Sequence, residues 1–144
     1  MKICFGCDHG GFLLKEEVKK HFASTDIEIV DFGCLDNNRV DYPEYGIKVA
    51  RSVASGECDY GVLICTTGIG MSIVANKVRK VRAALVTNLE AAQLTREHND
   101  SNVICLGAKY TTVEEAISYV ETFIKTQFSG GRHTNRVNMI KEVE

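Results

Sequence analysis

Apolar and polar residues follow two different periods along this chain, and the changes between them divide it into short and long segments. Short, nearly continuous apolar runs predict buried strands at Ile3–Cys7, Ile27–Phe32, Gly61–Cys65, Ala83–Val86 and Val103–Leu106. In the longer segments, apolar residues recur every three or four positions, which is the spacing of one helix face. These segments predict helices over residues 12–22, 71–78 and 89–98, two further helices that begin at Pro43 and Thr112, and a last amphipathic segment over about 133–144.

Local signals mark the ends of two of these helices. Pro43 is the only proline and suits the first turn of a helix whose apolar face begins at Tyr45. Thr112 and Glu115 have the spacing of a capping box, which opens the later helix. The residues Ser129–Gly131 are expected to end that helix.

Strands and helices alternate five times, which predicts a parallel sheet with helices on both faces. We expect a single domain, residues 1–144, with an open, five-stranded, Rossmann-like three-layer α/β fold. Ligands of such sheets bind outside the carboxyl ends of the strands. The pair Asp8-His9, the turn Cys65–Gly70 and the segment after Val86 all follow strands, so we expect them at one edge of the sheet.

Composition changes this picture little, but it excludes several classes of protein. Apolar residues make up 44% of the 144 and charged residues 25%, with a net charge of −2, so no general attraction to nucleic acid or anionic membrane is expected. No apolar run approaches the roughly 20 residues that span a bilayer. The first residues reach Asp8 too early for a signal peptide, so we expect a cytoplasmic protein.

Six cysteines are present, and most of them lie in or beside apolar runs. Cys4 and Cys7 have the C-x-x-C spacing, but residues three apart on a strand point to opposite faces. No second pair completes a zinc site. We therefore interpret Cys4 and Cys7 as small apolar residues and predict no metal site there.

The segment Tyr60–Ser72 carries the strongest candidate chemistry, because a buried strand, a tight turn and a helix start follow one another there. Cys65 ends the strand. It could be an inert buried cysteine, or a reactive thiol whose thiolate is stabilised by the helix start. Gly68-Ile69-Gly70 resembles part of a dinucleotide-binding motif, but Ile73 replaces the third glycine. A turn that holds an oxyanion with backbone N–H groups fits equally well.

Other polar residues each have a structural and a functional interpretation. Asp8 could cap the next helix, or it could point with His9 into a cleft. His98 could have only a structural role, as a partner of the helix dipole in the last turn of its helix, or it could have a functional role. Arg132 and Arg136 are four residues apart and could form a solvated basic face, or they could bind one anion together; His133 beside them is open to both interpretations.

Taken together, five segments resemble ribose-5-phosphate isomerase type B. They are GCDHGGF at 6–12, DYPEY at 41–45, ICTTGIGMSIVANK at 64–77, REHNDSNV at 96–103 and GGRHTNRV at 130–137. The resemblance spans nearly the whole chain. The wider family includes subunits of galactose-6-phosphate isomerase and enzymes that act on allose 6-phosphate.

The resemblance implies an aldose–ketose isomerase that interconverts ribose 5-phosphate and ribulose 5-phosphate without a cofactor. It implies that Cys65 is the base that moves a proton between C1 and C2 through a cis-enediolate, with Thr67 close to the same oxygens. The remaining implied roles are enediolate binding by the N–H groups of Gly68, Ile69 and Gly70, ring opening by His98 with Asp8, phosphate binding by His9, Arg132 and Arg136, and lining of the site by Tyr42 and Asn99.

The resemblance also implies a homodimer whose sites are built between subunits, and it leaves open whether dimers pair into tetramers. The final helix carries Val137 and Ile140 on one side, which would be buried against a partner subunit or against its own sheet. Two other functions remain open from the sequence. One is a subunit of a hexose-6-phosphate isomerase, and the other is a sugar-phosphate or nucleotide-binding module without catalysis.

Two positions depart from the family pattern. Thr66 stands where many relatives have glycine, and it narrows the turn after the strand. Lys109 stands where several relatives have arginine, so a phosphate contact there would lose its bidentate geometry. Relatives that use a glutamate base have it slightly further on, but Met71–Val74 contains no carboxylate, which leaves Cys65 as the candidate.

Overall fold

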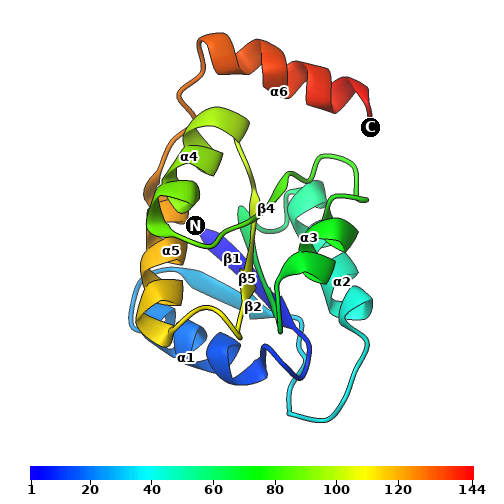
Figure 1. Ribbon diagram of the computed structural model, residues 1–144, viewed down its shortest axis with the longest axis vertical. Coiled ribbons are helices and arrows are strands. Elements are labelled where there is room, and N and C mark those ends of the chain that lie inside the picture. Colours follow the sequence, from blue (N-terminus) through cyan, green and yellow to red (C-terminus); the bar gives the residue numbers. More distant parts are fainter.

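The computed structural model describes residues 1–144 and contains five strands and six helices (Figure 1). The strands are β1 (Lys2–Cys7), β2 (Glu28–Asp31), β3 (Tyr60–Cys65), β4 (Ala83–Leu85) and β5 (Val103–Gly107), and the helices are α1 (Phe12–Ala23), α2 (Tyr42–Ser55), α3 (Ile69–Ala75), α4 (Leu89–Asn99), α5 (Val113–Lys125) and α6 (Arg132–Glu142). All strands run parallel in the order β2-β1-β3-β5-β4, which confirms the predicted parallel α/β sheet. No helix is both long and apolar enough to cross a membrane.

Helices cover both faces of the sheet, with α1, α4 and α5 on one side and α2 and α3 on the other (Figure 1). Because side chains alternate along a strand, each central strand contributes to two apolar clusters. On β1, Ile3 and Phe5 belong to the cluster under α1 and α5, whereas Cys4 packs under α2 with Val49. The central strands β1, β3 and β5 are buried almost throughout, as is expected for a parallel sheet covered on both faces.

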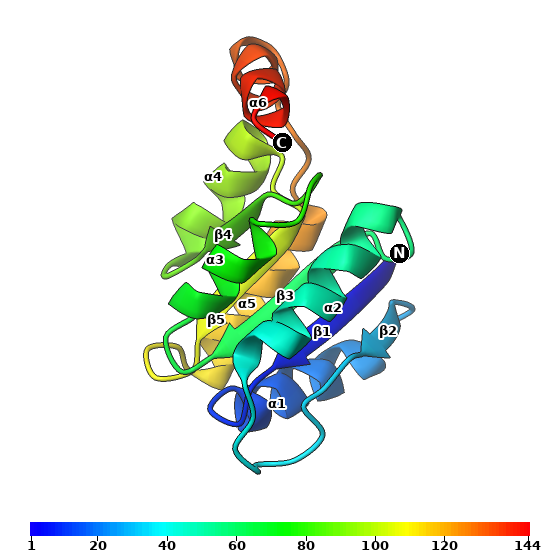
Figure 2. The same cartoon turned by 90° about the vertical axis from the view of Figure 1, so that its right-hand side faces the viewer.

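Helix α6 lies apart from these layers, beyond the amino ends of the strands (Figure 2). Only Val137 of this helix is buried, while Ile140 is 46% and Val143 is 86% exposed. The helix therefore does not pack on its own sheet. Its packing on a partner subunit remains a prediction.

Helix α3 begins and ends earlier than the predicted 71–78. It begins at Ile69 because Gly68 has a φ of +77°, which ends the preceding turn. It ends at Ala75, and the side chain of the next residue, Asn76, ties the helix end to the edge strand β4. The Asn76 amide nitrogen donates to the Ser72 and Ala83 carbonyls, both at 2.9 Å, and its oxygen accepts from the Ala83 N–H at 2.9 Å.

Helix α5 has the predicted capping box, in which the Thr112 and Glu115 side chains each accept from the other's backbone N–H. It stops at Lys125, four residues before the predicted Ser129. Thr126 is already extended, and the buried Arg96 guanidinium binds its carbonyl at 3.2 Å. A tertiary contact therefore sets this helix end.

A buried lysine joins α1 to the end of β2. Lys15 is fully buried, and its ammonium group contacts the two Asp31 carboxylate oxygens at 2.8 and 2.7 Å and the Cys34 carbonyl at 2.9 Å. Lys19 contacts the same carboxylate. Burial alone would raise the pKa of Asp31, but the hydrogen bonds from the two lysines outweigh it, and the pKa is lowered.

The strand order reverses direction between β1 and β3, because the chain passes from β1 to β2 on one side and then to β3 on the other. In open α/β sheets such a reversal leaves a crevice outside the carboxyl ends of the two strands, where ligands bind. Asp8 directly follows β1, and Cys65 is the last residue of β3. The topology therefore places these two residues on either side of the crevice.

Candidate functional site

Cys65 lies at the carboxyl edge of the sheet, where β3 turns into α3. Its side chain is 4% exposed, and its sulfur accepts a hydrogen bond from the Gly68 N–H at 3.1 Å. A hydrogen bond donated to sulfur stabilises the thiolate form. Burial raises the pKa of the Cys4, Cys7 and Cys105 thiols well above the usual value, which favours their protonated form.

The turn after Cys65 presents a set of backbone N–H groups. Thr67 shapes it, because its hydroxyl oxygen accepts from the Ile69 N–H at 3.3 Å. The N–H groups of Gly70 and Met71 follow in the first turn of α3, where no intrahelical acceptor exists. The resemblance implied enediolate binding by the N–H groups of Gly68, Ile69 and Gly70, but those of Gly68 and Ile69 already donate to Cys65 and Thr67. The N–H groups of Gly70 and Met71 are therefore the ones left for an oxyanion.

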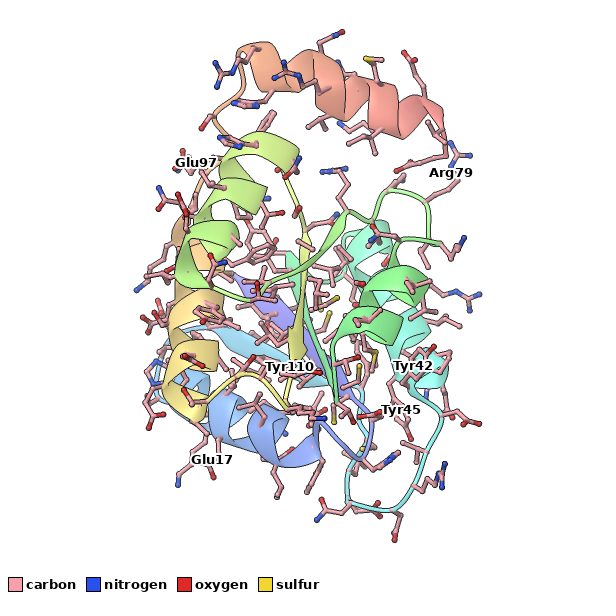
Figure 3. All side chains as sticks on the ribbon, viewed as in Figure 1. Glu17, Tyr42, Tyr45, Arg79, Glu97 and Tyr110 are labelled. Atoms are coloured by element: carbon pink, nitrogen blue, oxygen red, sulfur yellow. The ribbon has the colours of Figure 1, made fainter.

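Close backbone approaches explain two glycines in this turn. A Cβ on Gly68 would lie 2.8 Å from the Leu106 carbonyl carbon, so only glycine fits against the end of β5. A Cβ on Gly70 would lie 2.6 Å from the Tyr42 ring, which therefore packs directly on the start of α3. Figure 3 shows Tyr42 and Tyr110 at this edge of the molecule.

The turn after β1 brings Asp8 and His9 to the same edge. The Asp8 carboxylate is buried and accepts the Gly11 N–H at 3.0 Å, which supports the capping interpretation of this residue. The Asp8 carboxylate and the Thr66 side chain both lie close to Gly10. His9 is exposed, and its Nδ1 accepts the Val40 N–H at 3.3 Å, which leaves Nε2 free for a ligand.

His98 and Asn99 lie at the opposite edge, near the amino ends of the strands. They belong to the last turn of α4, which returns antiparallel to the strands. The 11 residues of α4 rise about 15 Å at the usual 1.5 Å per residue. In Figure 3, Glu97, which precedes His98, lies on the upper left of the molecule and Tyr42 on the lower right.

Arg132 and Arg136 join this second group from α6, where both side chains are exposed. Between them lies His133, whose ring stacks on the His98 ring with centroids 4.3 Å apart and planes 13° apart. The sequence left the role of His133 open, and the stack gives it a definite partner. In the sequence, only the spacing of the basic residues in GGRHTNRV pointed to a role for His133. Its contact with His98 could not be predicted, because that contact depends on the path of residues 126–131 between α5 and α6.

A buried ion-pair network fixes the end of α4 beneath His98. Arg96 is 5% exposed and binds the Asp100 carboxylate at 2.9 Å, and Arg82 binds the same carboxylate at 2.9 Å. Asp100 has a φ of +48°, which closes the helix sharply. Arg96 and Asp100 are four residues apart, but Arg82 is 18 residues from Asp100, so the three-membered network does not follow from local spacing.

The candidate site residues therefore form two groups that one chain does not bring together. The carboxyl-edge group contains Asp8, His9, Tyr42, Cys65, Thr67, Gly68, Ile69 and Gly70, and the amino-edge group contains His98, Asn99, Arg132 and Arg136. A cavity of about 480 Å³ lies beside α6 and is lined in part by Arg82 and Ile140. It is thus at the amino edge and not beside Cys65.

The two departures from the family pattern both lie at the carboxyl edge. Thr66 is exposed, with its backbone carbonyl accepting from the Lys109 N–H at 3.0 Å. The Lys109 ammonium group lies 5.9 Å from the centre of the Tyr110 ring. Both side chains are therefore at the rim of the crevice beside Cys65.

Comparison with known proteins gives matches over the full chain. A family model described as Ribose/Galactose Isomerase matches residues 3–140. Ribose-5-phosphate isomerase B of Escherichia coli K12 is 45% identical over 143 residues, which cover 99% of this chain and 96% of that protein.

Two solved structures show that the likeness extends to the fold. The ribose-5-phosphate isomerase B of Clostridium thermocellum has 48% identity and a TM-score of 0.97, covering 99% of this chain and 97% of that one. The ribose-5-phosphate isomerase B of Mycoplasma genitalium, solved with bound ribulose-5-phosphate, has 38% identity and a TM-score of 0.94, covering 99% and 95%.

Proposed function

This chain belongs to the ribose/galactose isomerase family, and we propose that it interconverts ribose 5-phosphate and ribulose 5-phosphate with Cys65 as the base. The observation that carries this proposal is the hydrogen bond from the Gly68 N–H to the Cys65 sulfur, at the carboxyl end of β3 beside the point where the strand order reverses. The bound ribulose-5-phosphate of the Mycoplasma genitalium relative supports a pentose phosphate as substrate.

In the proposed reaction, the Cys65 thiolate removes the C2 proton of the open-chain aldose. The electron pair of that C–H bond becomes the C1=C2 bond of a cis-enediolate, and O1 gains negative charge. The N–H groups of Gly70 and Met71 have no acceptor in the chain and would stabilise that charge, with the Thr67 hydroxyl nearby. The proton then returns to C1, and O2 becomes the ketone oxygen as its own proton passes to O1.

The amino-edge group would open the ring and hold the phosphate. His98 would act on the ring oxygens together with Asp8, and Asn99 and Tyr42 would line the site. Arg132 and Arg136 would bind the phosphate dianion together with His9, because guanidinium groups suit the geometry of phosphate oxygens. The two positive charges of Arg132 and Arg136 match the double negative charge of the phosphate.

A homodimer would bring the two groups together. One sugar phosphate cannot reach Cys65 and His98 of the same chain, because the length of α4 separates them. A twofold axis that sets the carboxyl edge of one protomer against the amino edge of its partner would complete two identical sites. The exposed apolar residues of α6, Met139 and Ile140, and Val143 just after it support burial of this helix against a second copy.

The experiment that tests this function is turnover by the purified protein on ribose 5-phosphate, allose 6-phosphate and galactose 6-phosphate, with a chelator present. We expect a clear preference for ribose 5-phosphate and no effect of the chelator. A preference for either hexose phosphate would identify the alternative function, a hexose-6-phosphate isomerase. No turnover on any of the three would overturn the proposal.

A further inference from the structure

The stacked pair of His98 and His133 joins two elements that are separate in the sequence. His98 is in the last turn of α4, and His133 is the second residue of α6. Their ring centres are 4.3 Å apart and their planes are 13° apart, so the two faces lie nearly parallel and in contact. Each ring is partly exposed, and each therefore keeps an edge toward solvent.

The chain donates no hydrogen bond to either ring. His9 and His21 differ in this respect, because the ring of His9 binds the Val40 N–H and the ring of His21 binds Glu121. Stacking is thus the contact that sets the plane of the His98 ring. A histidine without such a contact rotates freely about its two side-chain torsions.

The surroundings favour a neutral His133. Partial burial lowers its pKa, the charge of His98 lowers it further, and Arg132 and Arg136 on its own helix act in the same direction. Glu97, which precedes His98 on α4, acts in the opposite direction. Two imidazolium rings in face-to-face contact repel each other, and a neutral His133 removes that repulsion from the stack.

We propose that His133 is a positioning residue for ring opening, and that its flat face holds the His98 ring in the orientation that proton transfer to the furanose requires. This inference rests on the proposed function. In ring opening, a base takes the proton of the anomeric hydroxyl, and the O–H electron pair forms the C1=O bond. The C1–O4 bond breaks toward O4, which receives a proton. A single imidazole that passes a proton between O1 and O4 must keep its ring plane fixed.

The chemistry of the two sugars allows this step to be measured separately. Ribose 5-phosphate closes a furanose ring through O4 and must be opened before C2 is deprotonated. Ribulose 5-phosphate has its ketone at C2 and a phosphate on O5, so it cannot close that ring and binds as an open chain. Exchange of its C1 hydrogen with solvent therefore reports the Cys65 step without ring opening.

The test compares His133→Ala, His133→Phe and the control Asn138→Ala, which changes an exposed residue of the same helix. We expect His133→Ala to lower turnover of ribose 5-phosphate roughly tenfold, because misplacing a catalytic group by a fraction of an ångström costs this much or more. Deuterium uptake at C1 of ribulose 5-phosphate in D₂O is expected to stay unchanged. His133→Phe keeps a flat ring and is expected to restore most of the turnover.

The outcomes separate this inference from the proposed function. Absence of both reactions in the unmodified protein overturns the function itself. If the unmodified protein catalyses both reactions, then equal losses of turnover and exchange in His133→Ala overturn the positioning role. Normal turnover of His133→Ala, or a His133→Phe variant as poor as the alanine variant, overturns it as well.

Discussion

The Gly68 N–H donates a hydrogen bond to the Cys65 sulfur at 3.1 Å, across the turn that ends β3. The sulfurs of Cys4 and Cys34 instead donate to backbone carbonyls. Cys4 contacts the Val49 carbonyl at 3.8 Å, and Cys34 contacts the Asp36 carbonyl at 3.2 Å. A carbonyl partner favours the thiol, whereas an N–H partner favours the thiolate, so local geometry distinguishes Cys65 among six buried cysteines.

The first prediction concerns this sulfur as a base. We expect Cys65→Ala to reduce isomerisation by about 10²–10⁴-fold, the usual contribution of a general base, with little change in the affinity for substrate. The matched control is Cys105→Ala, which removes a buried sulfur from the neighbouring strand β5. Initial rates and equilibrium binding of ribulose 5-phosphate would be measured for both variants. An active Cys65→Ala variant would exclude this residue as the base.

The second prediction concerns the phosphate. We expect Arg132→Ala and Arg136→Ala each to raise KM for ribose 5-phosphate roughly tenfold or more, because each removes a charge-assisted hydrogen bond. Inhibition by inorganic phosphate should weaken in parallel. Lys141→Ala is the control, since it removes an exposed positive charge from the last turn of the same helix. A KM that changes as little for the arginine variants as for Lys141→Ala would contradict the assignment.

The third prediction concerns the close contact between Gly10 and Thr66, the position that departs from the family pattern. A Cβ on Gly10 would collide with the Thr66 hydroxyl. We expect Gly10→Ala to destabilise the protein by about 1–3 kcal/mol, as overpacking does, and to be nearly neutral in a Thr66→Gly background. Chemical denaturation of the four proteins of this cycle measures the coupling.

Gly11→Ala is the contrasting case for that cycle. Its Cβ would collide with the Ile64 carbonyl, which belongs to the backbone of β3 and cannot rotate away. We therefore expect Thr66→Gly to leave the cost of Gly11→Ala unchanged. Equal coupling of both glycines to Thr66 would show that the turn moves as a whole, against the local collision described here.

The fourth prediction concerns the buried pair of Lys15 and Asp31. We expect Asp31→Asn to lower the free energy of unfolding at pH 7 by about 3 kcal/mol, because it removes the closer of the two carboxylates that contact the buried Lys15 ammonium group, Glu16 being the other. The pKa of Asp31 is lowered in the folded state, so its contribution is complete above the unfolded value of about 4 and is lost as pH falls through the lower folded value. The difference between the two proteins should therefore shrink below about pH 4.

Denaturant titrations at several pH values measure this difference. Glu44→Gln is the control, since Glu44 pairs with Lys48 at 2.8 Å on an exposed helix face. An exposed pair of this kind contributes little, and no measurable change is expected. The pH dependence would be contradicted if the free energies of unfolding of Asp31→Asn and of the unmodified protein differed at pH 3 by as much as at pH 7.

The sequence predicted the strands and their parallel arrangement because each strand is a short apolar run between two amphipathic helices. It did not predict that β4 lies outside β5, since strand order depends on contacts between distant segments. The end of α3 at Asn76 and the end of α5 beside Arg96 depend on side chains that reach other elements. Local periodicity carries no information about such contacts.

In the candidate site, too, some placements follow from the sequence pattern and others depend on contacts between distant segments. Cys65 and Asp8 could be placed together because both follow strands that end at one edge of the sheet. His98 could also have been placed from the sequence, because a helix between two parallel strands returns antiparallel to them and ends at the opposite edge. The stack of His98 on His133 could not be predicted, because the loop between α5 and α6 has no periodic pattern.

The last prediction follows from the separation of Cys65 and His98 at opposite ends of the sheet. If each site takes its base from one protomer and its ring-opening histidine from the partner, two inactive variants can restore each other. In a mixed dimer of Cys65→Ala and His98→Asn, one site carries both changes and the other carries neither. Random mixing gives about half mixed dimers, so about a quarter of the unmodified activity should return.

The matched control mixes Cys65→Ala with Asp8→Asn. Both of these residues lie at the carboxyl edge of one chain, so each site of a mixed dimer keeps one of the two changes and no activity should return. The variants would be mixed after dissociation and reassociated, and initial rates would be compared with the unmixed proteins. Recovery in the first mixture alone requires a site shared between subunits. Recovery in neither mixture would contradict the shared site. Cys65 and His98 would then have to act on the sugar within one chain, although α4, about 15 Å long, runs from one edge of the sheet to the other.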